Sequence, residues 1–565
     1  MRCKELSTNI FAAGVALAAT LLAGPGAFAQ QINDTIEDRF DQPRAPLSQG
    51  GRFIPAFDPL AAPPAASGIT FRLSDIAVVG NTAISDEDLR MLYAASLGTE
   101  ISVGELFSIA NDITALYGQR GYPLSRAIVP AQEIGGQGVV RLQVIEGYVD
   151  KVVVEGTAAK NPLVKHHGEK ITGERPISNQ TLERHLLLAD DLPGISVKSV
   201  LRSGEAVGGT TVVLQTEPEK PFQFSITADN RGSKAVGPLQ VDAKLVFANL
   251  IAPNSETTLR FVNASASKEL LYLTAEQRFV LNSEGTKLSF GLQRSNSEPG
   301  TQIFKNIELE SSATTAFLTL THPLIRSRTK NLEMHGTFEA RNSETLSLGL
   351  PLSQDRVRSL RFGFDFDNTD KIGGLNTISV EISKGLSKFG ASDDSDPLKS
   401  RQFGKVNYSK VNLDMSRTQQ LGALSPELSS WSVYGQLTAQ LTGDPLLSSE
   451  ECGIGGTEYG RAFESSTISG DRCFAGSLEV RYQTSNPSIF DSLQLFGFYE
   501  AGSASNLDAD ALPGTDTLAS AGLGARFAFM GRYSGSIELA KQVRNTSGGI
   551  NETSPRVFFS LSGEF

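Results

Sequence analysis

An alternation of apolar and polar residues runs from about residue 221 to the end of the chain and constrains the fold more than any other feature. In FQFSITADN, Phe222, Phe224 and Ile226 alternate with polar residues, and SLRFGFDFDN repeats the pattern. Charged residues recur on the polar side of the predicted strands, namely Asp242, Lys244, Arg361, Asp365 and Glu381. A soluble sandwich rarely contains this many long strands. A membrane barrel requires such alternation, because lipid-facing residues must be apolar while lumen-facing residues are polar.

The length of this region is compatible with a barrel of about 16 strands. Residues 219–565 accommodate about 16 antiparallel transmembrane strands, at ~22 residues for each strand with its connection. The final stretch, RVFFSLSGEF, alternates again and closes on Phe565. An aromatic residue in this position is the pattern that bacterial outer-membrane barrels present to their assembly machinery. We therefore expect Phe565 to act as a barrel-assembly signal, with the barrel-assembly machinery and outer-membrane lipid as partners.

The start of the chain predicts export. Two basic residues precede an apolar run over residues 10–22, and AFA at residues 27–29 has the small-x-small pattern of a signal-peptidase site. The run is too short to span a membrane comfortably, so we expect a signal peptide over residues 1–29. The formal net charge of −11 argues against a nucleic-acid-binding chain, which needs a basic face.

The segment that follows combines a short helix with a linker. QQINDTIEDRF places Ile32, Ile36 and Phe40 on one helical face, so we expect an amphipathic helix within residues 30–44. Residues 45–68 are rich in proline and lack periodicity, which predicts an extended linker. A short helix on a long tether is compatible with a disordered tail as well as with a docked helix.

Two consecutive regions then repeat the order β-α-α-β-β, over residues 69–147 and 148–218. In the first region, SVGELFSIANDITALYGQRGY begins with a capping box at Ser102 and Glu105. A module of this kind, repeated in an exported chain, resembles the POTRA domain of outer-membrane assembly and secretion machines. Such a domain leaves a sheet edge open, and an open edge can bind an extended partner chain by strand addition.

Two POTRA-like modules ahead of a C-terminal barrel resemble the outer-membrane transporters of two-partner secretion, the haemolysin and filamentous haemagglutinin secretion-activation family. The barrel segments DNRGSKAVGPLQVDAKLVFANL, THPLIRSRTKNLEMHGTFEARN, SKGLSKFGAS and GQLTAQLTGDPLLSSEECGIGG, with YGRAF after them, carry this resemblance. It implies a transporter that binds an unfolded exoprotein of the haemolysin or adhesin type in the periplasm and translocates it through the barrel. It also implies the outer membrane of a Gram-negative bacterium, periplasmic POTRA domains, and a pore-plugging role for residues 30–44.

The resemblance further implies a pair of interacting motifs inside the barrel. In the family, the sixth extracellular loop folds into the lumen and carries a Val-Arg-Gly-Tyr/Phe tetrad, and a late strand carries Phe-x-Asp-x-Gly. The matching loop residues are Gly460, Arg461, Ala462 and Phe463, and the matching strand residues are Phe498, Glu500 and Gly502. Glu500 replaces the family's Asp. A guanidinium can donate to a carboxylate through two parallel hydrogen bonds, so we expect a salt bridge between Arg461 and Glu500 in the lumen.

Several alternatives remain at the level of sequence. Cys452 and Cys473 flank the loop, and either a disulfide or two free thiols is compatible with an oxidising compartment. The five histidines form no metal-ligand pattern and no catalytic triad or phosphate-binding motif stands out, so we expect no enzyme activity, metal or cofactor. We expect a monomer. The alternative functions are an outer-membrane protein assembly factor, which usually carries more POTRA modules, and a diffusion porin, which needs none.

Overall fold

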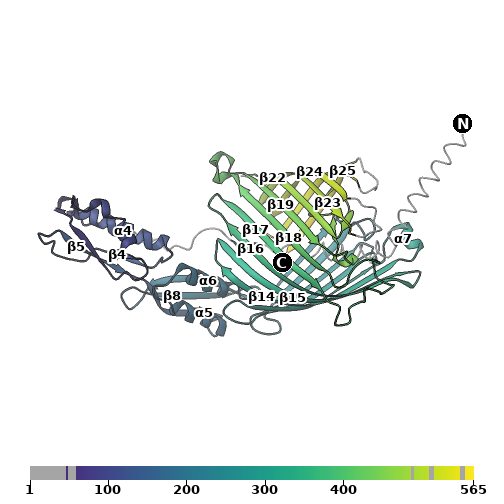
Figure 1. Ribbon diagram of the computed structural model, residues 1–565, viewed down its shortest axis with the longest axis horizontal. Coiled ribbons are helices and arrows are strands. Elements are labelled where there is room, and N and C mark those ends of the chain that lie inside the picture. Colours follow the sequence, from purple (N-terminus) through teal and green to yellow (C-terminus); the bar gives the residue numbers. More distant parts are fainter. Residues whose placement is uncertain (1–45, 49–58, 267, 485–488, 508–514, 547–553) are drawn as a thin grey trace.

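The computed structural model describes residues 46–48, 59–266, 268–484, 489–507, 515–546 and 554–565 (Figure 1). The predicted signal peptide, the predicted helix within residues 30–44 and most of the linker lie outside the described residues. Among the described residues, no helix has both the length and the apolar character to cross a membrane.

The first small domain consists of short strands and two helices around an apolar core. Its elements are η1 (Ala66–Gly68), β1 (Thr70–Arg72), β2 (Asp75–Val79), α3 (Asp86–Arg90), η2 (Ala94–Ser96), β3 (Glu100–Ser102), α4 (Val103–Gln119), β4 (Arg126–Ile128) and β5 (Val139–Ile145). The main sheet has the order β2-β5-β4, and β1 pairs with β3. Helix α4 starts at the capping box of Ser102 and Glu105, and it buries Leu106, Ile109 and Ile113 against the sheet.

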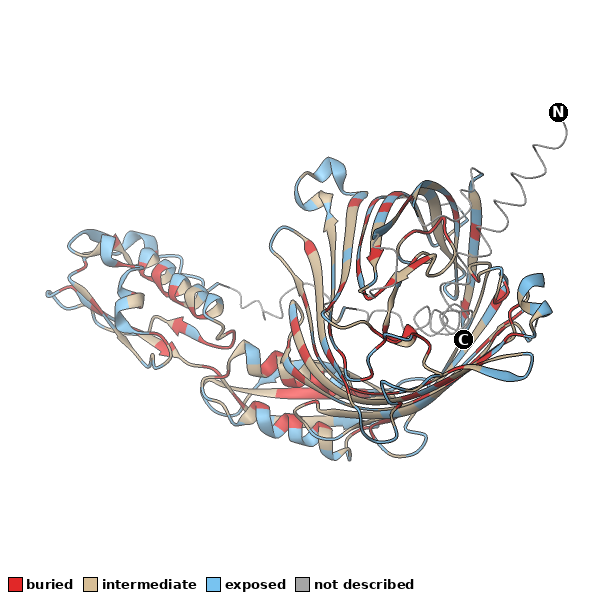
Figure 2. Ribbon diagram, turned by 45° about the vertical axis from the view of Figure 1, so that its right-hand side comes forward, coloured by how far each residue is buried: buried red, intermediate tan, exposed pale blue. Residues whose placement is uncertain are grey.

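The second small domain repeats this arrangement. Its elements are β6 (Tyr148–Gly156), α5 (Pro162–Thr172), α6 (Asn179–Asp190), β7 (Ile195–Ser203) and β8 (Gly209–Pro218). Strand β8 lies between β6, to which it is parallel, and β7, to which it is antiparallel. Asn161 caps α5 and Ser178 caps α6 through side-chain hydrogen bonds to backbone amides, which is why the helices begin where they do. Buried residues gather in the interior of both small domains (Figure 2).

The remainder of the chain forms a closed barrel of 16 antiparallel strands. The barrel strands are β9 (Phe222–Asp229), β10 (Gln240–Ala248), β11 (Ser255–Ala264), β12 (Leu271–Val280), β13 (Lys287–Ser297), β14 (Glu310–Arg326), β15 (Lys330–Ser347), β16 (Leu350–Thr369), β17 (Gly374–Gly385), β18 (Ser409–Gln420), β19 (Trp431–Thr442), β22 (Arg472–Gln483), β23 (Ser492–Ser505), β24 (Thr515–Phe529), β25 (Tyr533–Asn545) and β26 (Arg556–Glu564). The barrel closes where β26 pairs with β9. Its connections contain α7 (Gln302–Asn306), η3 (Leu421–Ala423), η4 (Pro426–Leu428), η5 (Ser448–Glu450) and the paired strands β20 (Cys452–Ile454) and β21 (Ile468–Gly470).

The two faces of the barrel follow the sequence alternation. Along β16, Leu360, Phe362 and Phe364 are exposed on the outer wall, whereas Ser359 is buried on the lumen side. Phe565 extends the last strand: its amide donates to the carbonyl of Phe224 at 2.9 Å, and the two rings stack.

Contacts between the second small domain and the barrel define the two ends of the barrel. Arg326, at the end of β14, donates through Nε and Nη2 to both carboxylate oxygens of Asp191, each at 2.8 Å. Arg184 of α6 donates to the carbonyls of Glu284 and Pro323 at 3.2 and 2.9 Å. The turns after β12 and β14 therefore lie at the end that faces the small domains, and α7 lies at the opposite end (Figure 1).

Candidate functional site

The connection between β19 and β22, residues 443–471, folds into the barrel, and we call it the inward loop. Its two short strands, β20 and β21, pair inside the barrel, and its tip carries Ala462 and Phe463, which are fully or almost fully buried. Gly460 adopts a φ of +77°, and a Cβ atom at this position would lie 2.6 Å from a Leu518 methyl carbon. The positive φ therefore favours glycine at this position, and the loop tip lies in close contact with the wall.

A second glycine on the barrel wall accommodates the loop. A Cβ atom at Gly502 would lie 2.9 Å from two side-chain carbons of Ile454, so the inward loop packs directly against the backbone of β23. Around this contact the loop tip joins an apolar cluster with the wall, which includes Ile454, Phe463, Ile468, Phe496, Phe498 and Leu518. This cluster explains why the loop positions that flank Arg461 are small or apolar.

The structure brings Arg461 and Glu500 together. The Nε of Arg461 donates to Oε1 of Glu500 at 2.6 Å. The second oxygen, Oε2, accepts from the backbone amides of Gly460 and Arg461 at 2.8 and 2.9 Å and from the Ser520 hydroxyl at 3.0 Å. The guanidinium also lies over the Phe498 ring, 3.6 Å from its centre.

The contact between Arg461 and Glu500 differs from the bidentate salt bridge that the sequence suggests. Because the loop backbone occupies Oε2 of Glu500, the guanidinium uses only Nε on this carboxylate and turns Nη1 toward Glu479, at 3.2 Å. Glu538 lies 3.8 Å from the same Nη1. The side chains of Glu500, Glu479 and Glu538 are 0, 2 and 5% exposed, so Arg461 lies among three buried carboxylates. We call these four residues the lumen ion cluster.

Sequence reasoning missed Glu479 and Glu538, together with the arginines that balance them. Glu479 accepts from Arg481 and Arg526, with shortest distances of 2.6 Å each, and Arg231 lies 2.6 Å from Glu538. The sequence does contain one indication of these residues: the alternation of apolar and polar residues along β22 and β25 places Glu479 and Glu538 on the lumen face. Alternation alone does not show which charges on different strands meet.

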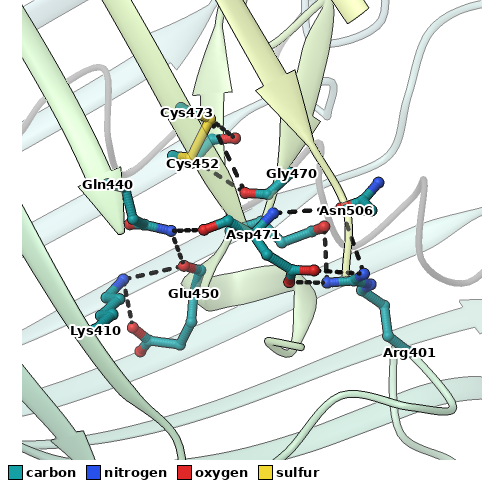
Figure 3. The surroundings of a disulfide bond; sticks show 10 residues. Arg401, Lys410, Gln440, Glu450, Cys452, Gly470, Asp471, Cys473 and Asn506 are labelled. Carbon is teal, nitrogen blue, oxygen red and sulfur yellow. Dashed lines mark hydrogen bonds and ion pairs between the residues drawn. A yellow bond between two sulfur atoms is a disulfide. The ribbon is translucent and has the colours of Figure 1, made fainter. Parts of the chain in front are cut away.

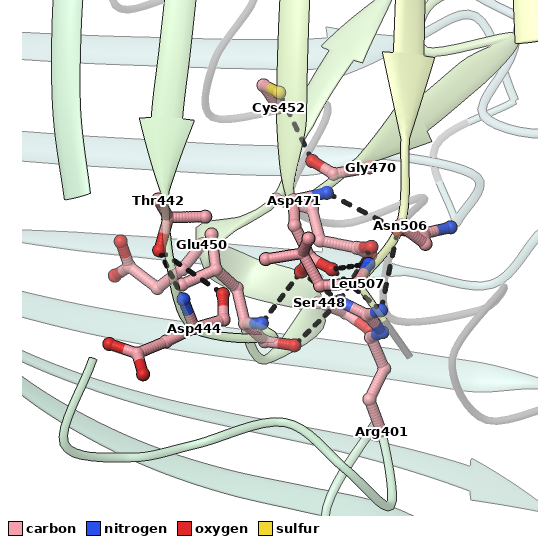
Figure 4. A network of polar contacts seen from close by, with 12 residues as sticks. Arg401, Thr442, Asp444, Ser448, Glu450, Cys452, Gly470, Asp471, Asn506 and Leu507 are labelled. Atoms are coloured by element: carbon pink, nitrogen blue, oxygen red, sulfur yellow. Dashed lines mark hydrogen bonds and ion pairs between the residues drawn. The ribbon is translucent and has the colours of Figure 1, made fainter. Parts of the chain in front are cut away.

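The base of the inward loop is fixed by a disulfide between Cys452 and Cys473, which joins the start of β20 to the start of β22 (Figure 3). Beside it, the fully buried Asp471 accepts from Nη1 of Arg401 at 2.6 Å and from the amides of Leu446 and Leu507, both at 2.7 Å (Figure 4). The loop is thus held covalently at its base and by ion pairs at its tip.

A second group of charges holds the part of the loop that enters the lumen after β19. Glu450 of η5 lies 3.0 Å from Arg361 of β16 and 2.8 Å from Lys410 of β18. Figure 3 shows the contact with Lys410. Among the described residues, no group of three or more His, Cys, Asp or Glu side chains is arranged to hold a metal ion. The site is therefore a set of ion pairs that positions a loop in a pore.

Two small domains of this topology, a 16-stranded barrel and a loop folded into its lumen are the architecture of POTRA-bearing outer-membrane barrel proteins. The profile of the haemolysin secretion/activation protein ShlB/FhaC/HecB family matches residues 208–527, and the ShlB-type POTRA profile matches residues 71–147. The chain belongs to the ShlB/FhaC/HecB family. It is a two-partner secretion transporter of the outer membrane, with its POTRA domains in the periplasm.

Individual relatives agree with this assignment. The chain is 23% identical over 492 residues to the outer membrane transporter CdiB of Dickeya dadantii, covering 85% of this chain and 84% of the relative. It is 23% identical over 530 residues to the heme/hemopexin transporter protein HuxB of Haemophilus influenzae, covering 91% of each chain. The solved structure of CdiB from Escherichia coli shares the fold, with a TM-score of 0.70 at 21% identity over 96% of this chain and 98% of that chain.

These findings confirm the predicted fold class, the predicted family and the predicted secretion function, and they favour neither the assembly factor nor the porin. Members of the family are transporters rather than enzymes, as we expect from the sequence.

Proposed function

We propose that the periplasmic POTRA domains bind an unfolded exoprotein as an added strand and pass it into the barrel. The exposed edges of their sheets support this proposal. In the second domain, β7 lies at the edge of the order β6-β8-β7, with Val200 exposed on it. An edge strand presents unpaired amide and carbonyl groups to an extended chain and can bind many sequences, because the hydrogen bonds are made by the main chain.

The inward loop is proposed to remain inside the lumen as a fixed wall element past which the exoprotein moves. The observation that carries this proposal is the lumen ion cluster, in which an arginine that is 7% exposed contacts carboxylates from three different barrel strands. Taking Arg461 out of the lumen would leave these buried carboxylates without one of their cations, which is costly. The cluster therefore favours one loop position.

Three further properties belong to the same proposal. The transporter works as a monomer, residues 30–44 plug the pore in the resting state, and the barrel-assembly machinery recognises the last strand through Phe565. The stacking of Phe565 on Phe224 at the closure of β26 on β9 supports a role for this residue in barrel closure.

Secretion in a reconstructed pair tests the proposed function. The transporter is co-expressed in a laboratory Gram-negative host with each large exported protein of the source genome in turn, and the culture medium is assayed for the exported protein. We expect one of these proteins to reach the medium only when the transporter is present. Periplasmic retention of all of them would contradict the proposal, and a loss of other outer-membrane barrels on depletion of the transporter would instead favour an assembly role.

A further inference from the structure

Basic side chains gather on the outer wall of the barrel at the extracellular end of β16 and β17. Arg356 and Arg358 share a face of β16 with Leu360, and Lys384 of β17 is in register with Leu360. Leu360 is 50% exposed and belongs to the lipid-facing band that continues through Phe362 and Phe364. The arginines therefore begin where the apolar band ends.

The end of the strands at which this patch lies follows from the hairpin geometry. Strands β15 and β16 connect through Leu348 and Gly349, at the end opposite the turn after β14 that contacts the POTRA domains. Arg356 and Arg358 lie on the hairpin side of Leu360. Because the POTRA domains are periplasmic, the basic residues lie at the level of the outer leaflet.

A bulge after β17 lies against this wall. The amide of Leu386 donates to the carbonyl of Arg358 at 2.8 Å, and the amide of Ser392 donates to the carbonyl of Arg356 at 2.9 Å, so residues 387–391 loop out between these two contacts. Phe389 at its tip is 70% exposed, and its ring meets the Phe338 ring edge to face at 5.7 Å. An exposed aromatic residue at this level is typical of a membrane interface.

One cation of the patch, Arg358, is used for hydrogen bonds within the protein. Arg358 is buried and directs its donors to the carbonyls of Phe389, Arg341 and Val357 and to the side chain of Asn342. It therefore holds the bulge in place.

The other cations of the patch are exposed. Lys384 reaches the carbonyl of Asn407 at 3.5 Å and the hydroxyl of Ser409 at 3.0 Å, and within the described part of the chain neither Arg356 nor Lys388 forms an ion pair. Three carboxylates of the same rim accept hydrogen bonds from neutral donors and, among the described residues, form no ion pair with the patch: Glu344 accepts from Gln354, Asp393 from Ser395 and Asp394 from Val406. The rim therefore presents exposed cations beside an apolar surface.

We propose that Arg356, Lys384 and Lys388 bind a phosphate group of an outer-leaflet glycolipid while Phe389 contacts its acyl chains. Phosphate is the anion that guanidinium and ammonium groups bind at such a position. The lipid is favoured as the source of the phosphate because the patch borders the apolar band and carries an exposed aromatic ring, which a freely dissolved phosphate would not use. This inference does not depend on the proposed route of the exoprotein.

Binding of purified lipid A to the full chain in detergent micelles tests the proposal. Each cation near an anionic lipid surface contributes a factor of about five to binding, so the double variant R356A/K388A should bind bis-phosphorylated lipid A about 25-fold more weakly than the wild-type chain. The matched control is K330A, because Lys330 is an exposed cation over the Phe366 ring on the same wall, at the periplasmic end. This control should bind as the wild type does.

Two additional binding measurements show whether a lipid or dissolved phosphate occupies the patch. Dephosphorylated lipid A should bind to the wild-type chain as weakly as intact lipid A binds to the double variant. Inorganic phosphate at about 10 mM should not compete with lipid A for the patch. Heat-modifiable mobility in gels should show all variants folded, since both residues are exposed. The proposal is overturned by a double variant within about twofold of the wild type, by equal binding of dephosphorylated lipid A, or by competition from inorganic phosphate.

Discussion

An Arg461→Ala substitution would show whether the lumen ion cluster holds the inward loop inside the barrel. The change removes two hydrogen bonds, from Nε of Arg461 to Glu500 and from Nη1 of Arg461 to Glu479. Glu479 keeps Arg526 as a partner at 2.6 Å. The loss therefore falls mainly on Glu500, a fully buried carboxylate whose closest cation is Arg461.

The magnitude follows from the remaining contacts of Glu500. Breaking a buried ion pair by removing one partner costs about 3–5 kcal/mol. Glu500 would keep the amides at positions 460 and 461 and the Ser520 hydroxyl as donors, so the lower value applies. A loss of ~3 kcal/mol changes the docking equilibrium of the loop about 10²-fold.

Proteolysis of the loop measures this equilibrium. Glutamyl endopeptidase can cut at Glu458 and Glu464, which flank the loop tip, and cleavage follows the open population when the loop opens and closes faster than it is cut. We expect cleavage of R461A about 10² times faster than that of the wild type. We also expect loss of exoprotein from the medium while the barrel stays heat-resistant in the outer membrane.

A matched control distinguishes this effect from the general loss of a lumen arginine. Arg278 shares the lumen face of β12 with Glu276 and pairs with Glu256 at 3.2 Å and with Glu276 at 3.3 Å. R278A should leave loop cleavage and secretion unchanged. If R461A were cleaved as slowly as the wild type and secreted normally, the reasoning from the buried carboxylates would be refuted.

Four further predictions concern other parts of the chain. Glu500→Ala should stop secretion as R461A does, whereas Glu500→Asp, which restores the family's residue, should still secrete. Cys473→Ser opens a disulfide across a separation of 21 residues and should destabilise the docked loop by ~3 kcal/mol. Cleavage by the same protease should then be faster, and an unchanged cleavage rate would show that the bond does not hold the loop. Burial lowers the pKa of His167 from 6.5 to about 4 and also lowers the pKa of His185, which lies against it. The unfolded chain therefore takes up protons first, and the stability of the second POTRA domain should be complete above pH 6.5 and fall toward pH 4, with His167 contributing ~1.4 kcal/mol per pH unit. Chemical denaturation measures this slope, and the exposed His166→Gln variant should keep it. Deleting residues 30–44 should raise single-channel conductance in planar bilayers, and unchanged conductance would identify this segment as a tail.

The sequence by itself determined the architecture, because the signals involved are local. The period-two pattern of SLRFGFDFDN depends only on neighbouring residues, and it placed Phe362 outside and Arg361 inside without knowledge of any partner strand. The capping box at Ser102 likewise needs only four consecutive residues. Length and alternation together were compatible with about 16 strands, since each barrel strand must span the same membrane, but the exact strand number came from the closed barrel.

The tertiary structure decided which charges meet, because those contacts depend on strand register and on a loop that enters the barrel from its extracellular end. Arg461 and Glu500 could be paired through the resemblance to a known family, but Glu479 and Glu538 reach the same guanidinium only once 16 strands have closed. The disulfide at the base of the loop was undecided for the same reason. Local patterns report the direction in which a side chain points, and distances across a barrel are set only when every strand has taken its register.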